Sequence, residues 1–203
     1  MGEGVLSPEI RCPVGKGNPL LRQAITSVFG MGIRTFLEEV VEQGVTLLPD
    51  NRVGIRLRCR YWSRRLAAGS APRTIGKFSL MKRPEKIFIG QSVINNFVTL
   101  DATYGEGIRI GDQVLIGPYT VVVSYDHGFE DRSRPIREQE CQGGQVTIED
   151  DVWVGAHCVI TRNVTIGRGS VIGAGSVVTH NIPPGSIAHG SPARVVGQRG
   201  SAD

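Results

Sequence analysis

The sequence predicts an all-β solenoid, a parallel β-helix, with a helical segment before it and one long loop protruding from it. The main observation is an aliphatic residue at every sixth position. Nine positions at this spacing are all Ile or Val: Ile110, Ile116, Val122, Ile148, Val154, Ile160, Ile166, Ile172 and Val178. A half-buried strand alternates with a period of two and a helix repeats every 3.6 residues, so neither explains a period of six. A short strand followed by a tight turn does, and three such units close one coil.

The second observation is the residue that follows the aliphatic position. It is glycine in five of the nine repeats: Gly111, Gly117, Gly155, Gly167 and Gly173. We expect these glycines to supply corner conformations that a Cβ atom would oppose. The aliphatic side chains then stack inward from coil to coil, and neighbouring coils cover the apolar surface that one coil cannot bury alone.

The repeat is interrupted in two ways. Its register slips over residues 81–85 and 103–107, and a polar segment at 128–145 replaces it entirely. A long insert on one face of a solenoid is commonly functional. We therefore expect a β-helix domain over residues 74–190 with a protruding loop at 128–145, and a C-terminal tail over 191–203.

Residues 1–73 precede the repeat and are expected to form an arm followed by a helical, arginine-rich segment. Asn18 and Pro19 resemble an N-cap with proline at the first helical position. Gly30 and Gly32 are expected to divide the helical segment into two short helices, and Gly44 to close the second at positive φ.

The arginine-rich stretch carries much of the positive charge of this 203-residue chain, whose formal net charge is +4. It contains Arg52, Arg56, Arg58, Arg60, Arg64, Arg65 and Arg73. Such a stretch can face phosphate, anionic sugar or membrane headgroups, or it can be a solvated face or an intersubunit ion-pair region. Few aromatic residues interleave with it, so we do not expect nucleic-acid binding.

The four cysteines, Cys12, Cys59, Cys141 and Cys158, form no CxxC pair and follow no signal peptide. This spacing indicates neither a disulfide framework nor a zinc site and favours a reducing, cytoplasmic location. Because no apolar run is long enough to span a bilayer, any membrane contact would be peripheral, through the arginine-rich stretch.

Three motifs resemble the left-handed β-helix acyltransferases, which include galactoside, maltose, serine and polysaccharide O-acetyltransferases. They are IGPYTVVVSYDHGF at 116–129, VTIEDDVWVGAHCVI at 146–160 and VTIGRGSVIGAGSVVTHNIPPGSIAHGSPARVV at 164–196. The resemblance covers about residues 74–198. It implies the left-handed sense of the coils, against the general preference of parallel crossovers, as well as acetyl-CoA as co-substrate and a homotrimer with the donor in a groove between subunits.

The resemblance also implies that His127, directly before the loop, is the catalytic base. A sugar hydroxyl is a poor nucleophile, and an imidazole can accept its proton at neutral pH as the oxygen attacks the thioester. Asp126 is not expected to orient this ring, because adjacent residues of an extended segment point to opposite sides. No covalent acyl-enzyme is required, although Ser124 and Cys141 lie near enough in sequence to test.

The remaining site residues come from the same resemblance. Asn95 or Asn96 matches an asparagine that binds the acceptor, with a turn or asparagine ladder as the alternative. His180 stands where many relatives have lysine, which weakens an expected phosphate contact. Residues matched to the donor site are Trp153, Ala156, Ala174, Thr179, His180 and Arg194. For Trp153 the alternative is subunit packing, and for Arg194 a solvated cation of the tail.

The function expected is therefore O-acetylation of a sugar or of a polysaccharide or glycolipid precursor, with no metal and no tightly bound cofactor. N-acetylation of an amino-sugar nucleotide would use the same fold, donor and base. A γ-type carbonic anhydrase would need three histidines converging on zinc, which the spacing of His127, His157, His180 and His189 does not favour. A non-catalytic β-helix would not need the DHGF motif before its loop.

Overall fold

The computed structural model describes residues 19–200, and within the first helix it describes side chains from residue 32 onward except residue 34. The described residues divide into two units, of which the first ends at residue 41 and the second begins at residue 42. The second unit contains the repeat together with residues 42–73, so the structure groups this part of the arginine-rich segment with the coils rather than with the N-terminal arm.

Helix α1 (Pro19–Thr46) is one continuous helix, so the expected division at Gly30 and Gly32 does not occur. A glycine inside a helix costs only about 1 kcal/mol relative to alanine, which a long helix tolerates. Gly44 also lies within the helix and does not adopt positive φ. The expected N-cap, Asn18, lies outside the described residues.

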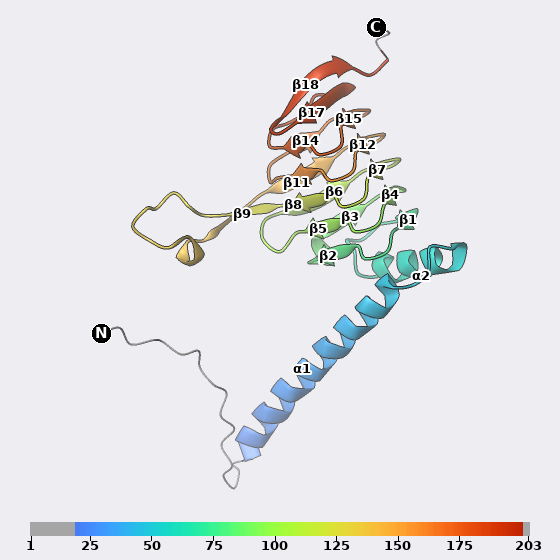
Figure 1. The fold of residues 1–203 in the computed structure, drawn as a ribbon. Coiled ribbons are helices and arrows are strands. Elements are labelled where there is room, and N and C mark those ends of the chain that lie inside the picture. The colour runs from blue at the N-terminus through green and yellow to red at the C-terminus, as the bar shows by residue number, and fades with distance from the viewer. Residues whose placement is uncertain (1–18, 201–203) are drawn as a thin grey trace. The chain divides into compact units, whose positions relative to one another are not determined.

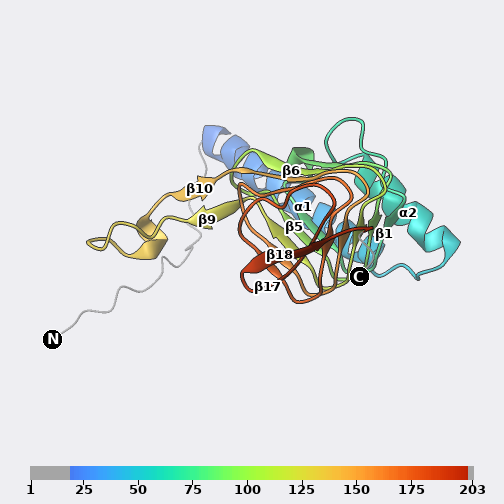
Figure 2. The ribbon, with the colours of Figure 1, turned by 90° about the horizontal axis from the view of Figure 1, so that it is seen from above.

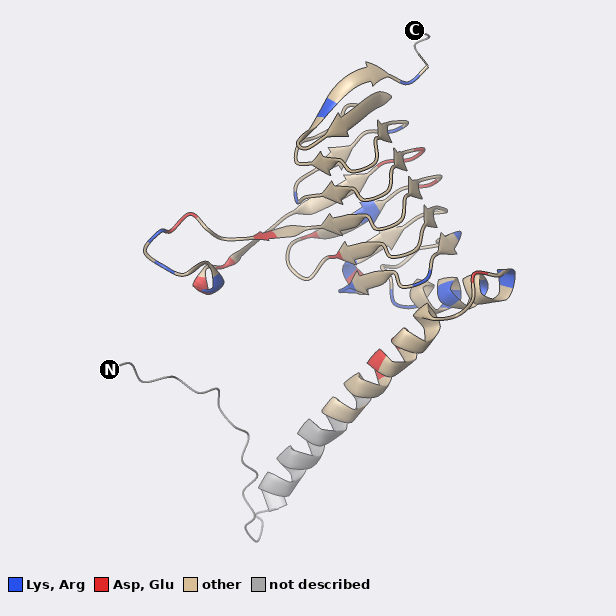
Figure 3. Ribbon diagram, in the orientation of Figure 1, with Lys and Arg blue, Asp and Glu red and all other residues tan. Residues whose placement is uncertain are grey.

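Helix α2 (Arg52–Ser63) is capped at its N-terminus by Asn51, whose side chain accepts a hydrogen bond from Gly54 N at 2.8 Å. Figure 3 shows several basic residues, coloured blue, on this helix, and all of them are arginines. Most of these arginines are exposed, but Arg58 is fully buried, donates from Nε to Ile75 O at 2.7 Å and pairs with Asp50. Arg58 therefore fastens α2 to the first coil, a structural role that the sequence analysis did not assign.

The repeat folds into short strands that pass in turn through three sheets (Figure 1). Sheet A contains β1 (Thr74–Ile75), β4 (Val93–Ile94), β7 (Leu115–Ile116), β12 (Trp153–Val154), β15 (Val171–Ile172), β17 (Ser186–Gly190) and β18 (Ala193–Gln198). Sheet B contains β2 (Leu80–Lys82), β5 (Thr99–Asp101), β8 (Val121–Val123), β13 (Val159–Ile160) and β16 (Val177–Val178). Sheet C contains β3 (Ile87–Ile89), β6 (Gly107–Ile110), β11 (Gln145–Ile148) and β14 (Thr165–Ile166). The 3₁₀ turns are η1 (Pro84–Lys86) and η2 (Ile136–Glu138).

Strands within each sheet pair in parallel, apart from the antiparallel pair β17–β18, which confirms the expected parallel strands. The aliphatic residues stack in register: Ile116 aligns with Val154, and Val154 aligns with Ile172. None of the nine Ile and Val residues of the six-residue repeat is more than 1% exposed. Strand β18 belongs to sheet A, so residues 193–198 of the expected tail are a paired strand.

The glycines of the repeat have a different role from the one expected. None of the five adopts positive φ; the left-handed positions at the corners between sheets A and B are instead Phe78, Phe97, Tyr119 and His157, with φ between 55° and 60°, and Gly175, with φ of 72°. A Cβ added to Gly155 would lie 2.5 Å from Ala174 N of the next coil. Glycine is needed there because adjacent coils approach closely, not because the turn requires its backbone freedom.

Bulky residues at these left-handed positions stabilise one another. The rings of Phe78, Phe97, Tyr119 and His157 form a continuous stack, with centroids 4.9, 4.7 and 4.9 Å apart. Each ring lies at the same corner of successive coils, so the stack runs along the coil axis. Ring stacking contributes to offset the backbone cost of left-handed φ in residues other than glycine.

The insert leaves the coils after β8 as a two-stranded ribbon. Strand β9 (Tyr125–His127) pairs antiparallel with β10 (Cys141–Gly143), with His127 opposite Cys141. Figures 1 and 2 both show the ribbon and its loop projecting away from the sheets. The excursion therefore begins at Tyr125 rather than at residue 128, and His127 lies on the ribbon.

Candidate functional site

The chain turns three corners in each coil, and two of them carry the expected site residues. We call the passage from sheet A to sheet B the AB corner and the passage from sheet B to sheet C the BC corner. The β9–β10 ribbon leaves the coils at the BC corner, between β8 and β11. His127 therefore belongs to the BC corner.

His127 is exposed and contacts its partner strand through one ring nitrogen. Its Nδ1 lies 3.5 Å from Cys141 Sγ, and its ring lies 6.5 Å from that of Tyr125 in an edge-on arrangement. Within the described part of the chain, no hydrogen bond is formed by Nε2. If Nδ1 donates its proton to the sulfur, Nε2 is the unprotonated nitrogen and can accept a proton from a substrate.

Asp126 points away from the imidazole, as expected for its neighbour on an extended segment. Its Oδ2 accepts from Arg162 Nε at 2.7 Å, and Arg162 also donates to Gln142 Oε1 at 2.8 Å. Arg162 belongs to the turn after β13, so this ion pair ties both strands of the ribbon to the next coil. The contact holds the ribbon that carries His127 against the coils.

A polar cluster that the sequence analysis missed lies at the same corner. Asp101, only 7% exposed at its side chain, accepts from Lys82 Nζ at 3.0 Å and from Thr103 N and Oγ1 at 3.0 and 2.5 Å. Tyr125 OH lies 3.4 Å from Asp101 Oδ2. The register of the coils brings these residues together: Lys82 aligns with Asp101, and Asp101 with Val123 just before the ribbon.

The cluster shifts the pKa of each of its ionisable members. Burial raises the pKa of Asp101, but hydrogen bonds from Thr103 and Lys82 outweigh it, so the pKa of Asp101 is lowered. The hydrogen bond and the charge of Asp101 raise the pKa of Lys82. Burial and the charge of Asp101 raise the pKa of Tyr125. At neutral pH the cluster is thus a carboxylate held by an ammonium group and a phenol.

The two asparagines lie at the other corner. Asn95 Nδ2 donates to Ile116 O at 2.9 Å, and Asn96 Oδ1 accepts from Lys77 N at 2.8 Å while its Nδ2 donates to Asp50 at 3.2 Å. The bonds to Ile116 and Lys77 join neighbouring coils at the AB corner, and the bond to Asp50 joins Asn96 to the segment before α2. Within one chain the side chains of the two asparagines therefore stabilise the AB corner and do not lie beside His127.

The residues matched to the donor site are also divided between corners. Ala156 and Ala174 lie on adjacent coils at the AB corner, where Gly175 N donates to Ala156 O at 2.8 Å. Trp153, on the outer face of sheet A, is 55% exposed. Thr179 and His180 follow β16 at the BC corner.

His180 and Arg194 come together although they lie far apart in the sequence. Both line a hollow of about 300 Å³, with Asn181, Ile182, Ala193 and Val195. Thr179 Oγ1 lies 2.9 Å from His180 Nδ1, and Arg194 Nη1 donates to Ala193 O at 2.9 Å. The guanidinium of Arg194 and the ring of His180 therefore offer donors to one ligand.

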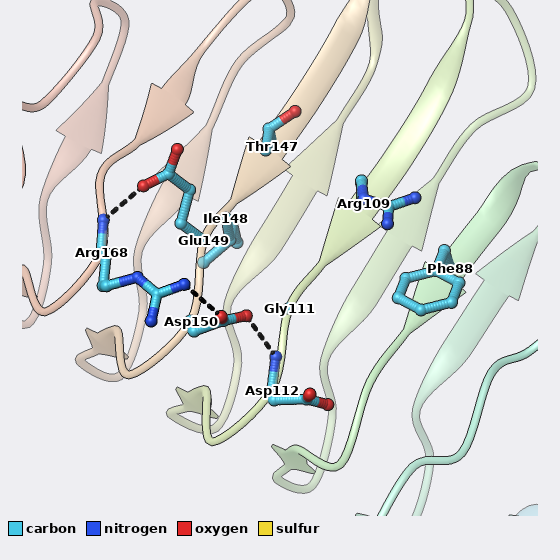
Figure 4. Close-up of a pocket in the computed structure, with 9 residues that line it drawn as sticks. All are labelled: Phe88, Arg109, Gly111, Asp112, Thr147, Ile148, Glu149, Asp150 and Arg168. Carbon is cyan, nitrogen blue, oxygen red and sulfur yellow. Dashed lines mark hydrogen bonds and ion pairs between the residues drawn. The ribbon is translucent and has the colours of Figure 1, made fainter.

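A larger hollow, of about 540 Å³, lies on sheet C away from the expected site residues (Figure 4). Its charged groups already serve the coils: Asp150 accepts from Asp112 N at 2.8 Å and from Arg168 Nη2 at 2.7 Å. Arg109 lies over the ring of Phe88, 4.5 Å from its centroid. These contacts give the charged residues a structural role in joining the coils, and we assign no catalytic or binding role to this surface.

No group of three or more His, Cys, Asp or Glu side chains within residues 19–200 is arranged to hold a metal ion. None of the helices described is long and apolar enough to cross a membrane.

Comparison with known proteins gives the family. The family model for bacterial transferase hexapeptide (six repeats) matches residues 145–180. The crystal structure of a hexapeptide-repeat-containing acetyltransferase from Vibrio cholerae, complexed with acetyl coenzyme A, is 32% identical, covers 70% of this chain and 75% of its own, and superposes with a TM-score of 0.61. The chain belongs to the hexapeptide-repeat acetyltransferases.

Other hexapeptide-repeat acetyltransferases are similar over much of the chain. The galactoside O-acetyltransferase of Escherichia coli is 38% identical over 130 residues, which is 61% of this chain and 62% of that protein. The structure of a maltose O-acetyltransferase from Clostridium difficile is 26% identical, covers 82% of this chain and 86% of its own, and has a TM-score of 0.65. The chain spans 36% to 62% of the length of the curated relatives it matches first.

Proposed function

We propose that the protein transfers an acetyl group from acetyl-CoA to a hydroxyl of a sugar or of a polysaccharide or glycolipid precursor, with His127 as the general base. The observation that carries the proposal is the place of His127 on the ribbon: Nδ1 faces Cys141 Sγ at 3.5 Å and leaves Nε2 without an intramolecular partner among the described residues. Family membership supplies the donor, because the Vibrio cholerae relative was crystallised with acetyl coenzyme A.

In the proposed reaction Nε2 removes the proton of the acceptor hydroxyl as its oxygen attacks the thioester carbonyl. The new C–O bond forms, the tetrahedral oxyanion collapses, and the C–S bond breaks. The imidazolium returns its proton to the departing thiolate, which leaves as coenzyme A. No acyl-enzyme and no metal take part, and a backbone N–H can stabilise the oxyanion.

A homotrimer explains why the expected residues are divided between corners. His127, Thr179, His180 and Arg194 lie at or beside the BC corner of one chain, whereas Asn95, Asn96, Ala156 and Ala174 lie at its AB corner. In a threefold cyclic assembly each interface joins two different surfaces of neighbouring copies, and we propose that the BC corner of one copy meets the AB corner of the next. We propose that acetyl-CoA and the acceptor bind in this groove, between left-handed coils like those the family resemblance implies.

Within that groove we assign the donor contacts by residue type. The small side chains of Ala156 and Ala174 let the pantetheine arm lie against the coil, and Trp153 offers an exposed ring. Thr179, His180 and Arg194 offer hydroxyl, ring and guanidinium donors to the phosphates. The AB-corner asparagines, already bonded to neighbouring turns, are positioned to support the acceptor side of the groove.

The proposal also retains the boundaries inferred from the sequence, a β-helix domain over 74–190 with flanking segments. A cytoplasmic location would give the enzyme access to acetyl-CoA. The exposed arginines of α2, such as Arg56 and Arg60, are the surface proposed for peripheral contact with a membrane or with an anionic, lipid-linked glycan.

The test is thiol release from acetyl-CoA with wild-type protein and a panel of acceptors: maltose, methyl β-galactoside, polysaccharide fragments and UDP-glucosamine. Acceptor-dependent release with a hydroxyl acceptor, and an ester in the product by mass spectrometry, is the expected result. An amide as the sole product would replace the proposal with N-acetylation. Absence of acetyl-CoA binding by calorimetry would contradict an acetyltransferase and favour a structural β-helix.

A further inference from the structure

We propose that Lys82 and Tyr125, both held on the buried carboxylate of Asp101, form the subsite that binds the acceptor, and that this subsite selects an uncharged sugar ring. The inference rests on the proposed function and adds the acceptor class and the residues that recognise it. Nothing in the sequence pattern separates these three residues from their neighbours.

Asp101 is the anchor rather than the ligand-binding group. Oδ1 accepts two hydrogen bonds from Thr103, and Oδ2 receives Lys82 Nζ at 3.0 Å and Tyr125 OH at 3.4 Å. Its side chain is 7% exposed, so little of the carboxylate remains for a substrate. The carboxylate places an ammonium group and a phenol side by side on the same oxygen.

Lys82 and Tyr125 keep unused hydrogen-bonding capacity toward solvent. The ammonium group of Lys82 has three donors, of which Asp101 takes one, and the side chain is 50% exposed. The single hydroxyl hydrogen of Tyr125 is directed at Asp101, and its oxygen keeps its acceptor lone pairs. Neighbouring hydroxyls of a sugar can use this combination, a donor and an acceptor close together, because each is itself both donor and acceptor.

Aromatic surface continues from this pair to the catalytic base. The ring of Tyr104 contacts that of Tyr125 edge-on, with centroids 5.0 Å apart, and the ring of Tyr125 lies 6.5 Å from that of His127. Tyr104 is 49% exposed. One monosaccharide with its exocyclic hydroxyls can span this distance, so a ring held by Lys82 and Tyr125 can present another hydroxyl to Nε2 of His127.

The charges of the corner favour a neutral acceptor. Lys82 pairs with Asp101, Arg83 with Glu85 and Arg162 with Asp126, at 3.0, 2.6 and 2.7 Å. Lys86 donates to a backbone carbonyl, Gly105 O, at 3.0 Å. These carboxylates balance the positive charge of the corner, so a pyrophosphate would bring its negative charges beside Asp101, Glu85 and Asp126, whereas an uncharged sugar needs only the donors that remain.

The experiment uses two readouts on wild type, Lys82→Met and Tyr125→Phe, with Lys86→Met as the matched control that removes a cation of the same corner not bound to Asp101. The first is saturation-transfer NMR with methyl β-galactoside and with maltose. The second is the KM for each sugar and for acetyl-CoA. We expect both subsite variants to lose the NMR signal and to raise the sugar KM about tenfold or more, as loss of a hydrogen bond to a charged group predicts, while the KM for acetyl-CoA stays within twofold.

Other outcomes separate the two proposals. Sugar binding that depends on Lys82 and Tyr125 without any acetyl transfer would contradict the proposed function and keep the subsite. Transfer with an unchanged sugar KM in both variants would overturn the subsite and keep the function. The subsite is equally overturned if neither neutral sugar binds wild type, if Lys86→Met behaves like Lys82→Met, or if UDP-glucosamine is the better acceptor by kcat/KM.

Discussion

Replacing Gly155 with alanine should destabilise the coils although the new methyl group would be small and apolar. Its Cβ would lie 2.5 Å from Ala174 N, 2.7 Å from Ala174 Cα and 3.0 Å from Ile172 O. These are backbone atoms of the next coil, and Gly155 N already donates to Ile172 O at 2.8 Å. The coils must move apart, which weakens the pairing of β12 with β15.

The cost follows from overpacking. Forcing an extra carbon into a packed site costs about 1–3 kcal/mol, and here no flexible side chain can move aside. For a chain of this size 1 kcal/mol corresponds to about 2–4 °C in Tm, so we expect Gly155→Ala to lower Tm by about 5–10 °C. Thermal unfolding followed by circular dichroism, at one fixed protomer concentration, measures it.

Two control glycines separate close approach from backbone conformation. Gly197 has neither positive φ nor any atom within 4 Å of an added Cβ, so Gly197→Ala should change the free energy of unfolding by less than about 0.5 kcal/mol. Gly175 also has open space but φ of +72°, so Gly175→Ala should cost about 1–2 kcal/mol. Equal Tm values for Gly155→Ala and Gly197→Ala would refute the reasoning.

Three further predictions concern charge and cysteine chemistry. Arg58→Met should lower the free energy of unfolding, measured by urea denaturation, by about 1–3 kcal/mol, because Ile75 O loses a buried, charged donor; a loss below about 0.5 kcal/mol would contradict it. Iodoacetamide should modify Cys141 well before Cys158 in peptide maps, since burial raises the pKa of the Cys158 thiol; the reverse order would be inconsistent with this structure. The folded-state pKa of Asp101 is lowered, so its stabilisation is present above about pH 4 and lost as pH falls through that lowered pKa. The Tm difference between wild type and Asp101→Asn should therefore shrink below pH 4, and a difference that grows there would show the opposite sign.

Much of the fold could be predicted from the sequence because the six-residue repeat is local. Each Ile or Val of the pattern is buried, and the break in the pattern after Val122 marks the insert. The same interruption of the repeat predicts that His127 lies where the insert leaves the coils. The repeat does not indicate how closely neighbouring coils approach. The sequence therefore predicts a turn role for Gly155, whereas the structure shows that glycine is needed there because the next coil lies so close.

The rest of the site depends on contacts between coils that no local pattern encodes. Lys82, Asp101 and Tyr125 meet because the parallel pairing of β2 with β5 and of β5 with β8 aligns them at one corner, where the ribbon leaves the coils. Arg58 looked like one of many surface arginines, yet its carbonyl partner lies 17 residues away. A single Asp or Lys in a polar stretch of sequence does not indicate that it contacts a residue of another coil. The roles of these residues can therefore be recognised only from the structure.

The most direct test of the account is acetyl transfer by His127→Asn, compared with wild type and with His189→Asn, which replaces another exposed histidine. With the best acceptor found and saturating acetyl-CoA, we expect His127→Asn to lose about 10²- to 10⁴-fold in kcat while Tm and acetyl-CoA affinity stay near wild type. His189→Asn should keep wild-type kcat. A His127→Asn variant that transfers acetyl groups at the wild-type rate would contradict the assignment of the catalytic base.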